Sequence, residues 1–202
     1  MYTQQHILTR FLLAPQATYD PTHTSRIKQY LDPNRPLKQA AVLIPLVLRK
    51  NRFQVVFTRR AQHLKHHPGQ VSFPGGRFES SDRDLIDTAL RETREETGII
   101  CTRADIFGQL PKLPTISGYI VTPYLSMISP DYLPALDPNE VDELFEAPLD
   151  YVLNPENMRT QNVIIDGKTH HIYSVPFNKY SIWGATAQML KVLSEQLWHE
   201  QK

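Results

Sequence analysis

The sequence has only one cysteine, Cys101, among its 202 residues, which excludes a disulfide within the chain. It also has no long hydrophobic run. The apolar patch at residues 11–14 ends at Pro15, and no segment approaches the ~20 apolar residues of a membrane-spanning helix. The same patch is too short for the apolar part of a secretory signal. These absences predict a cytoplasmic protein with no membrane partner.

The sequence also lacks an excess of charge of either sign. Its 22 Lys and Arg residues are balanced by 21 Asp and Glu residues, and the formal net charge is +1. Proteins that bind nucleic acid through its phosphates usually carry a strong positive field. We therefore expect no nucleic-acid partner, and any affinity for phosphate has to come from a local site.

Two parts of the chain differ in composition. Residues 1–36 are polar and interrupted by prolines, which predicts an N-terminal extension that packs on the core and contains one short helix near residues 25–31. Residues 37–202 have the size and the apolar content of a single globular domain. In the last part of this domain, Trp183 is more typical of a core residue than of a platform for substrate.

Hydrophobic periodicity places strands on both sides of a central helix. The expected strands are 40–48, 53–58, 71–73, 106–113 and 120–128. The central helix is expected at 84–97 and to end at Gly98. Further along the chain we expect short helical pieces within 141–153, a hairpin of 162–166 and 170–175 around a type I′ turn at Asp166-Gly167, and an amphipathic helix at 181–199. This order favours an α/β sandwich.

The central helix carries a cluster of carboxylates. At 100° per residue, Glu92, Glu95 and Glu96 fall within an arc of about 100° on one side of the helix. Mg²⁺ prefers oxygen ligands and is usually held by a few carboxylates together with substrate phosphates. The alternative is a solvated helix face, in which Arg91 forms i,i+4 ion pairs of a few tenths of a kcal/mol each. Such small energies do not decide between the two interpretations.

A resemblance to a known family does decide. Residues 91–99, RETREETGI, resemble the RExxEExGU half of the Nudix box, and Gly76 stands upstream where that box has a glycine. The resemblance implies a Nudix-type α/β/α sandwich, with a mixed sheet between helices, and hydrolysis of a diphosphate bond. It implies that Glu92, Glu95 and Glu96 are ligands of Mg²⁺ or Mn²⁺, and that the Gly76 carbonyl is a further candidate ligand. Arg91 would orient a glutamate through a charge-assisted hydrogen bond.

The first half of the box departs from the family pattern. Asp82 follows Gly76 after five residues, where the box has a glutamate, and eight residues rather than seven then separate it from Arg91. We expect a structural role for Asp82, and either Asp82 or Asp84 could cap the helix.

The segment before the box narrows the substrate. Residues 56–61, VFTRRA, are followed at matching spacings by Lys65, Gly69 and the FPGG of residues 73–76. This pattern resembles a signature of the coenzyme A pyrophosphatase branch of the Nudix family, with Lys65 in place of an arginine. The resemblance implies coenzyme A as the substrate. The implied substrate-binding residues are Arg59, Arg60, Lys65, His67, Gly75 and Gly76.

The resulting functional hypothesis is metal-dependent hydrolysis of coenzyme A or acyl-coenzyme A by a domain spanning residues 37–202. Glu92 and Glu140 are the two candidates for the general base, because Nudix enzymes often bring one further glutamate from a later loop. Arg91 and Glu95 complete the expected catalytic group. Alternatives are the same chemistry on NADH or ADP-ribose, and a Nudix fold used as a non-catalytic ligand sensor. The sequence leaves open whether the chain forms a homodimer.

Overall fold

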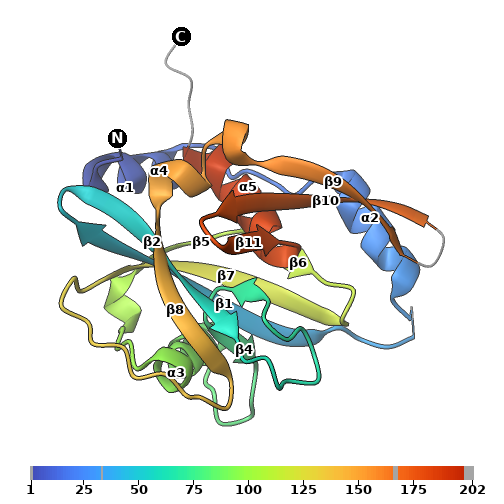
Figure 1. Cartoon of the computed structure of the whole chain (residues 1–202), viewed down its shortest axis with the longest axis horizontal. Coiled ribbons are helices and arrows are strands. Elements are labelled where there is room, and N and C mark those ends of the chain that lie inside the picture. Colours follow the sequence, from blue (N-terminus) through green and yellow to red (C-terminus); the bar gives the residue numbers. More distant parts are fainter. Residues whose placement is uncertain (1, 33, 166–167, 198–202) are drawn as a thin grey trace.

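A central mixed sheet is flanked by helix α3 on one face and by helices α4 and α5 on the other, in the computed structural model of the chain (Figure 1). The structure describes residues 2–32, 34–165 and 168–197. The α/β sandwich expected from the sequence is confirmed. No helix in the described ranges is long and apolar enough to cross a membrane.

Helices and strands are interspersed along the chain. The first half contains α1 (Gln4–Leu13), α2 (Pro21–Tyr30), β1 (Lys38–Arg49), β2 (Arg52–Arg60), β3 (Val71–Ser72), β4 (Gly75–Arg77) and α3 (Leu85–Thr97). The second half contains β5 (Ile106–Gln109), β6 (Leu113–Pro114), β7 (Tyr119–Ile128), β8 (Val141–Pro148), α4 (Leu149–Val152), β9 (Arg159–Ile165), β10 (Lys168–Phe177), β11 (Tyr180–Trp183) and α5 (Ala185–Leu197).

Strand β1 is the centre of the sheet. It pairs in parallel with β7 and antiparallel with β2 and with the short strand β4. Lys50 and Asn51 join β1 to β2, and both have positive φ, as the twist of a tight two-residue hairpin requires. The pairing of β4 with β1 fixes Gly75 opposite Val42 and Gly76 opposite Ala41. This register positions the site described below.

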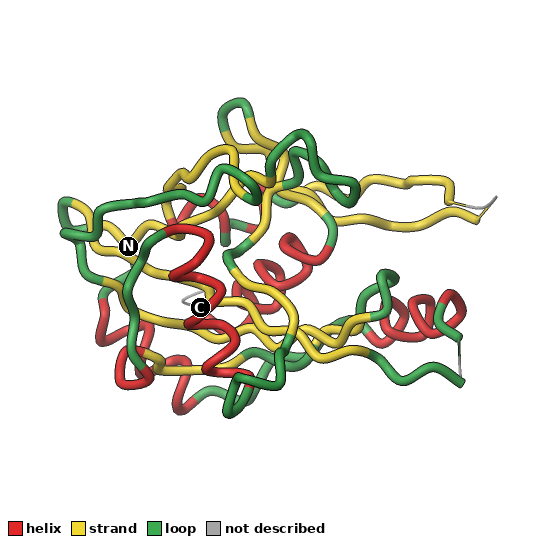
Figure 2. Tube along the Cα trace, turned by 90° about the horizontal axis from the view of Figure 1, so that it is seen from below, coloured by secondary structure: helices red, strands yellow, loops and turns green. Residues whose placement is uncertain are grey.

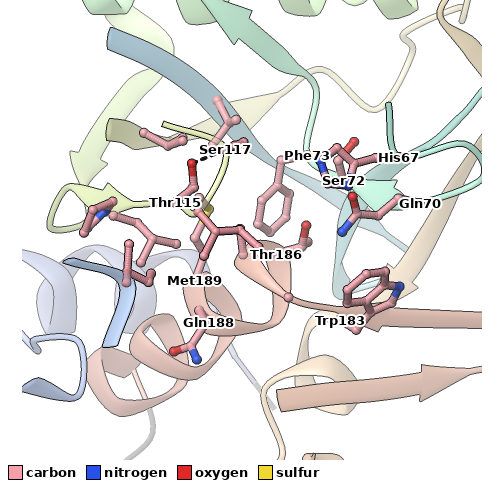
Figure 3. A pocket seen from close by; sticks show the side chains of 18 of the residues that line it. His67, Gln70, Ser72, Phe73, Thr115, Ser117, Trp183, Thr186, Gln188 and Met189 are labelled. Carbon is pink, nitrogen blue, oxygen red and sulfur yellow. Dashed lines mark hydrogen bonds between the residues drawn. The ribbon is translucent and has the colours of Figure 1, made fainter. Parts of the chain in front are cut away.

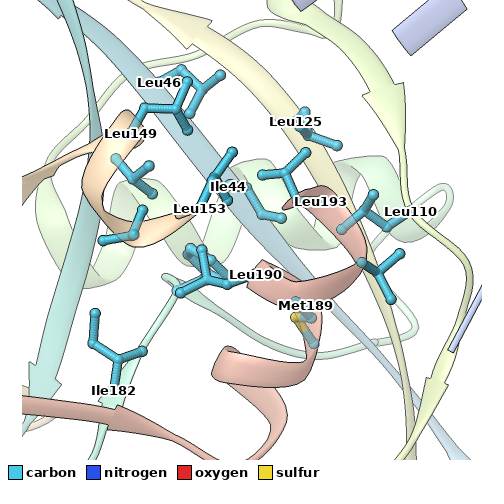
Figure 4. Close-up of a cluster of buried hydrophobic side chains, with 14 of the residues drawn as sticks. Ile44, Leu46, Leu110, Leu125, Leu149, Leu153, Ile182, Met189, Leu190 and Leu193 are labelled. Atoms are coloured by element: carbon cyan, nitrogen blue, oxygen red, sulfur yellow. The ribbon is translucent and has the colours of Figure 1, made fainter. Parts of the chain in front are cut away.

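Successive side chains of β1 supply two different cores, because they point to opposite faces of the sheet. Ala41 and Leu43 pack against Ala89 of α3. Ile44 and Leu46 join a larger cluster with α4 and α5, in which the leucines of both helices meet (Figure 4). Complete burial of one such side chain contributes roughly 1.5–3 kcal/mol to the free energy of unfolding.

The N-terminal residues form two helices, where the sequence predicted one. Ile7 of α1 is fully buried, and α1 contacts α5. Helix α2 begins at Pro21, earlier than the expected residue 25. The α1 helix was missed although Ile7 and Phe11, like Leu8 and Leu12, are spaced i,i+4; its packing partner α5 lies at the other end of the sequence.

Three predictions about secondary structure were wrong, and one of them is the single strand expected at 106–113, which is divided into β5 (106–109) and β6 (113–114). Residues 141–148 form strand β8 rather than helical pieces, because they pair along the length of β2; only 149–152 are helical. Residues 181–183 belong to strand β11, which pairs with β10, so the last helix begins only after Gly184, whose φ is +68°. Strands β9 and β10 form the expected hairpin, which extends from the body of the molecule (Figure 2). Its expected turn at 166–167 and the expected helix end at His199 lie outside the described residues.

Candidate active site

Helix α3 is held in place at both ends by local sequence. The Asp84 carboxylate caps its first turn by accepting hydrogen bonds from the N–H groups of Ile86 and Asp87 at 3.0 and 3.1 Å. Gly98 ends the helix at φ +72°, as the sequence predicted. The helix packs on β1 and β4, and this packing directs Glu92 and Glu96 toward the backbone of Gly75 and Gly76.

Glu96 is a buried carboxyl group without a cationic partner. Only 4% of the residue is exposed, and Oε2 accepts a hydrogen bond from the Gly75 N–H at 3.1 Å. No Lys, Arg or His of the described part of the chain forms an ion pair with it. Burial raises the pKa of Glu96 to about 8, and the nearby carboxylates of Glu140 and Glu92 act in the same direction.

Glu92 lies against a glycine that has room for no side chain. A Cβ atom on Gly76 would come within 2.4 Å of the Glu92 Cδ atom, so any larger residue would displace the carboxylate. Burial raises the pKa of Glu92, and Arg91 opposes the shift. Gly75, next to it, has φ +151°, and a Cβ there would come within 2.3 Å of the Ala41 carbonyl oxygen. The approach of Gly75 to β1 and the position of the Glu92 carboxylate therefore require glycine at residues 75 and 76.

Arg91 links the loop before α3 to the glutamates on it. Its Nε and Nη2 atoms donate to the two oxygens of Asp82 at 2.8 and 3.0 Å. Its Nη1 atom donates to Glu92 and to Glu95, each at 3.0 Å. Arg91 thus makes the orienting contact that the family resemblance implies.

Asp82 has a structural environment, as expected. The Asp82 carboxylate also accepts from the Glu79 N–H at 3.0 Å and from the Thr88 hydroxyl at 2.9 Å. The hydrogen bonds from Arg91 hold the pKa of Asp82 far below its usual range. Asp84, rather than Asp82, is the N-cap.

The remaining predicted catalytic residues are more open to solvent. The Glu95 side chain is 59% exposed, and Glu140 is exposed at the start of β8, where its charge acts on both Glu92 and Glu96. As the side chains lie, no three His, Cys, Asp or Glu residues within the described ranges are arranged to hold a metal ion. Arg91 contacts the oxygens that Glu92 and Glu95 would contribute.

The donor set nevertheless fits a hard divalent cation. Glu92, Glu96 and Glu140 each add to the electrostatic cost of ionising a neighbour, and the most buried of them, Glu96, lacks a positive partner. A cation would remove that cost, and carboxylate oxygens are the ligands that Mg²⁺ and Mn²⁺ prefer.

The predicted substrate-binding cations do not lie in one environment. Arg59 is paired with Asp142 at 2.6 Å and with Glu143 at 3.2 Å on β8. Arg60 is half-buried, and its charge lowers the pKa of Glu96. Lys65 and His67 are exposed on the loop between β2 and β3. Of the four, Arg60 has the clearest electrostatic link to the carboxylates.

A cavity of about 350 Å³ opens on the other face of the sheet from α3, and the sequence did not predict it (Figure 3). His67, Gln70 and Ser72 lie at one end, and Thr115 and Ser117 lie at the other. The walls between them are mostly apolar. Its lining comes from segments far apart in the sequence, namely α2, β1, β3, β6, β7, β10, β11 and α5.

Trp183 belongs to this cavity rather than to the core. The residue is 41% exposed and lies on the cavity wall, so the expectation of a core role was wrong. The reason is the end of β11 at this residue, where Gly184 turns the chain into α5 and leaves the indole at the surface.

Comparison with known proteins gives one consistent result. Residues 37–166 match the model of the NUDIX domain family. The uncharacterized Nudix hydrolase NudL of Salmonella paratyphi B is 36% identical over 196 residues, which cover 96% of this chain and 95% of that protein. NudL of Salmonella enteritidis gives the same values. Among solved structures, a MutT/nudix family protein from Enterococcus faecalis has a TM-score of 0.55 at 15% identity, over 96% of this chain and 73% of that one.

Proposed function

Because the chain belongs to the Nudix hydrolase family, we propose that it hydrolyses the diphosphate bond of coenzyme A or acyl-coenzyme A. The products are 4′-phosphopantetheine, or its acyl form, and adenosine 3′,5′-bisphosphate. Family membership supports the reaction class, and the segment from Arg59 to Gly76 supports the choice of substrate.

The observation that carries the proposal is the path of that segment. At Gly75 and Gly76 it contacts the carboxylates of Glu96 and Glu92. At His67 and Gln70 it lines the cavity. One continuous stretch, which bears the branch-specific signature, therefore lies beside both the candidate diphosphate site and a separate binding cavity. Coenzyme A is a diphosphate with a long, mostly uncharged arm and needs both.

Glu92, Glu95 and Glu96 would hold the divalent cation, with Glu140 nearby. When bound there, the cation neutralises charge on the diphosphate and makes an attacking water more acidic. The Glu92 and Glu95 oxygens now held by Arg91 have to be shared or released for this arrangement. The guanidinium of Arg91 keeps its two hydrogen bonds to Asp82 meanwhile. The side chains of Glu92 and Glu95 therefore move while Arg91 stays in place.

The proton from the water goes to a carboxylate. As the water oxygen forms a new P–O bond, the bridging P–O bond breaks and the water proton passes to the base. Glu92 is better suited than Glu140 in one respect, since burial raises its pKa and makes it a stronger base. Glu140 is exposed and its charge acts on both Glu92 and Glu96, so Glu92 and Glu140 are the two candidates that mutation should separate.

A substrate panel tests the proposal. The purified protein is incubated with coenzyme A, NADH and ADP-ribose, with and without Mg²⁺ or Mn²⁺, and the phosphate esters are identified. We expect metal-dependent release of adenosine 3′,5′-bisphosphate, with coenzyme A or its acyl form giving the highest kcat/KM. Cleavage of the other two with coenzyme A intact would keep the reaction and overturn the substrate.

A second candidate function is hydrolysis of another nucleoside diphosphate derivative, such as NADH or ADP-ribose. The lysine at residue 65, in place of the signature arginine, favours it. Lysine keeps the charge of the signature arginine but loses the two-pronged geometry that suits phosphate. The exposed position of Lys65 leaves it without a fixed orientation. A Lys65→Arg variant should raise kcat/KM for coenzyme A if the primary proposal is right, and a sensor would hydrolyse nothing in the panel.

A further inference from the structure

We propose that the cavity binds the acyl chain of acyl-coenzyme A, so that the protein prefers acylated over free coenzyme A. This inference rests on the proposed function and assigns its substrate more narrowly. The cavity volume, about 350 Å³, lies in the range of small-molecule sites, ~300–1,000 Å³.

The first argument is the connection between the cavity and the carboxylates. Val42 of β1 lines the cavity, and its register partner on β4 is Gly75, whose N–H donates to Glu96. The segment from His67 to Gly76 therefore borders the cavity at its start and the carboxylates at its end. In the proposal, a ligand whose diphosphate lies at Glu92 and Glu96 follows this segment and extends one of its halves into the cavity.

Second, the charge of the cavity lining selects which half of coenzyme A enters the cavity. Among the described residues that line the cavity there is no Lys, Arg, Asp or Glu. The lining does include His67, but burial and the charge of Arg60 lower the pKa of its imidazole, which favours the neutral form. Burial of a doubly charged phosphate without a cationic partner is costly, so the 3′-phosphate half does not suit this cavity. The cations Arg60 and Lys65 lie on the adjoining segment but outside the lining. The uncharged pantetheine arm and its acyl group are the half that fits.

The third argument is the order of polar and apolar groups along the cavity. His67, Gln70 and Ser72 lie near Phe73 at one end, where they can meet the amide groups of the arm (Figure 3). Toward β6 the lining includes Val121, which pairs with Leu113, and Ile27 of α2. Thr115 and Ser117 lie beyond these apolar side chains, at the far end of the cavity. An arm that enters beside His67, Gln70 and Ser72 places its amides first and its acyl chain among the apolar side chains between the two polar ends.

Two variants test the acyl site. Val121→Phe fills the β6 end, and Ile116→Glu puts a charge there at a residue that is 58% exposed and so makes little demand on the fold. The control is Ile120→Phe, one residue earlier on the opposite face of β7 and also half-buried. We expect octanoyl-coenzyme A to exceed free coenzyme A in kcat/KM in the natural protein. Each cavity variant should reduce that ratio roughly tenfold, as removal of apolar pocket contacts does, and the control should leave it unchanged.

A second measurement separates this inference from the proposed function. Octanoyl-pantetheine, which has no diphosphate, is titrated calorimetrically into the protein and its variants. Binding that Val121→Phe abolishes and Ile120→Phe preserves supports the acyl site even if no coenzyme A is hydrolysed, an outcome that would overturn the proposed function alone. Hydrolysis of coenzyme A with no binding of octanoyl-pantetheine and no acyl preference overturns the acyl site alone. Weakened inhibition by adenosine 3′,5′-bisphosphate in Val121→Phe also overturns it, because the other half would then occupy the cavity.

Discussion

Two buried carboxyl groups on either side of Arg91 have opposite environments. Asp82, in the loop before α3, accepts two hydrogen bonds from the Arg91 guanidinium and has a strongly lowered pKa. Glu96, in the last turn of α3, has only a backbone N–H from Gly75 and a pKa raised to about 8. Both lie within one short stretch of an acidic sequence, yet only Asp82 has the cation that a buried charge needs.

The difference separates residues that stabilise the site from residues that act in it. A paired buried carboxylate is costly to disrupt, because removal of either partner leaves the other charge unsatisfied. An unpaired one lowers the stability of the protein when it ionises, and it persists where a ligand supplies the missing charge. On this basis we propose that Asp82 positions Arg91 and that Glu96 is a cation ligand.

The largest expected effect is the loss of activity when Glu96 is substituted. Glu96→Gln should lower kcat/KM for coenzyme A by about a thousandfold, because loss of charge stabilisation worth several kcal/mol corresponds to that factor. Glu95→Ala should also abolish turnover with little change in the fold. Steady-state kinetics at saturating Mg²⁺ measure both, and circular dichroism checks that each variant is folded. Full metal-dependent activity in folded Glu96→Gln would remove Glu96 from the site.

Glu96→Gln should make the metal-free protein more stable than the natural protein at alkaline pH. Glu96 has a folded pKa of about 8 against an ordinary value of 4.5, so the unfolded chain loses this proton first as pH rises. The stability of the natural protein therefore falls between about pH 4.5 and pH 8, and Glu96→Gln should flatten that decline. Urea unfolding in EDTA at pH 5, 7 and 8.5 measures the difference. A parallel decline in both proteins contradicts the prediction.

Asp82→Asn should show the opposite pattern. It should lower the free energy of unfolding by roughly 3 kcal/mol at pH 7, since Arg91 is left without its main partner. The folded pKa of Asp82 lies below the ordinary value of 3.8, so this contribution is present above that pH and is lost as pH falls through the folded pKa. The destabilisation should therefore diminish in acid. Asp84→Asn is the comparison, because asparagine caps a helix about as well as aspartate and the ion pair with Arg103 that it loses is solvent-exposed and contributes little to stability. Equal losses from the two variants would argue against a special role for Asp82.

Added metal should stabilise the protein through the unpaired group. At a concentration one hundred times Kd, a ligand that binds only the folded state adds about 2.7 kcal/mol. We expect Mg²⁺ or Mn²⁺ to raise the melting temperature of the natural protein and of Asp82→Asn, but not that of Glu96→Gln. Differential scanning fluorimetry measures the melting temperatures of the three proteins with Mg²⁺, with Mn²⁺ and, as a further ion, with Ca²⁺. A shift retained in Glu96→Gln would place the cation elsewhere.

Arg91→Lys should have the smallest effect. Lysine keeps the positive charge but cannot serve Asp82, Glu92 and Glu95 at once with a planar group. We expect a loss of about 1–2 kcal/mol in stability, in the range of charge-assisted hydrogen bonds, with a modest fall in kcat. Urea unfolding measures the loss of stability and steady-state kinetics measure the fall in kcat, on one preparation of the variant. A large fall in kcat at unchanged stability would indicate direct contact between Arg91 and the substrate.

Local sequence was sufficient for α3 and its ends, because Asp84, Gly98 and the periodic apolar positions all act within a few residues. The family resemblance placed Glu92 and Gly76 in one site, and their close approach is visible only in the structure. Strand β8 was missed because Val141, Leu144, Phe145 and Pro148 have helical spacing, and only pairing with β2, more than 80 residues away, makes the segment extended. The cavity could not be predicted for the same reason, since Ile27, Val121 and Met189 are brought together by the fold alone.

The family match ends at residue 166 and begins at residue 37, whereas the cavity draws part of its wall from Ile27 and Tyr30 before that range and from Trp183 and Met189 after it. The Glu92–Glu96 helix and Gly75-Gly76 all lie within the range. The cavity also includes Val42, Phe73 and Val121 from within the range, so only part of its wall is encoded apart from the carboxylates, and that part can diverge at its own rate in descendants of one ancestor. Exchange of the flanking stretches between relatives is a direct route to enzymes with a retained reaction and an altered range of substrates.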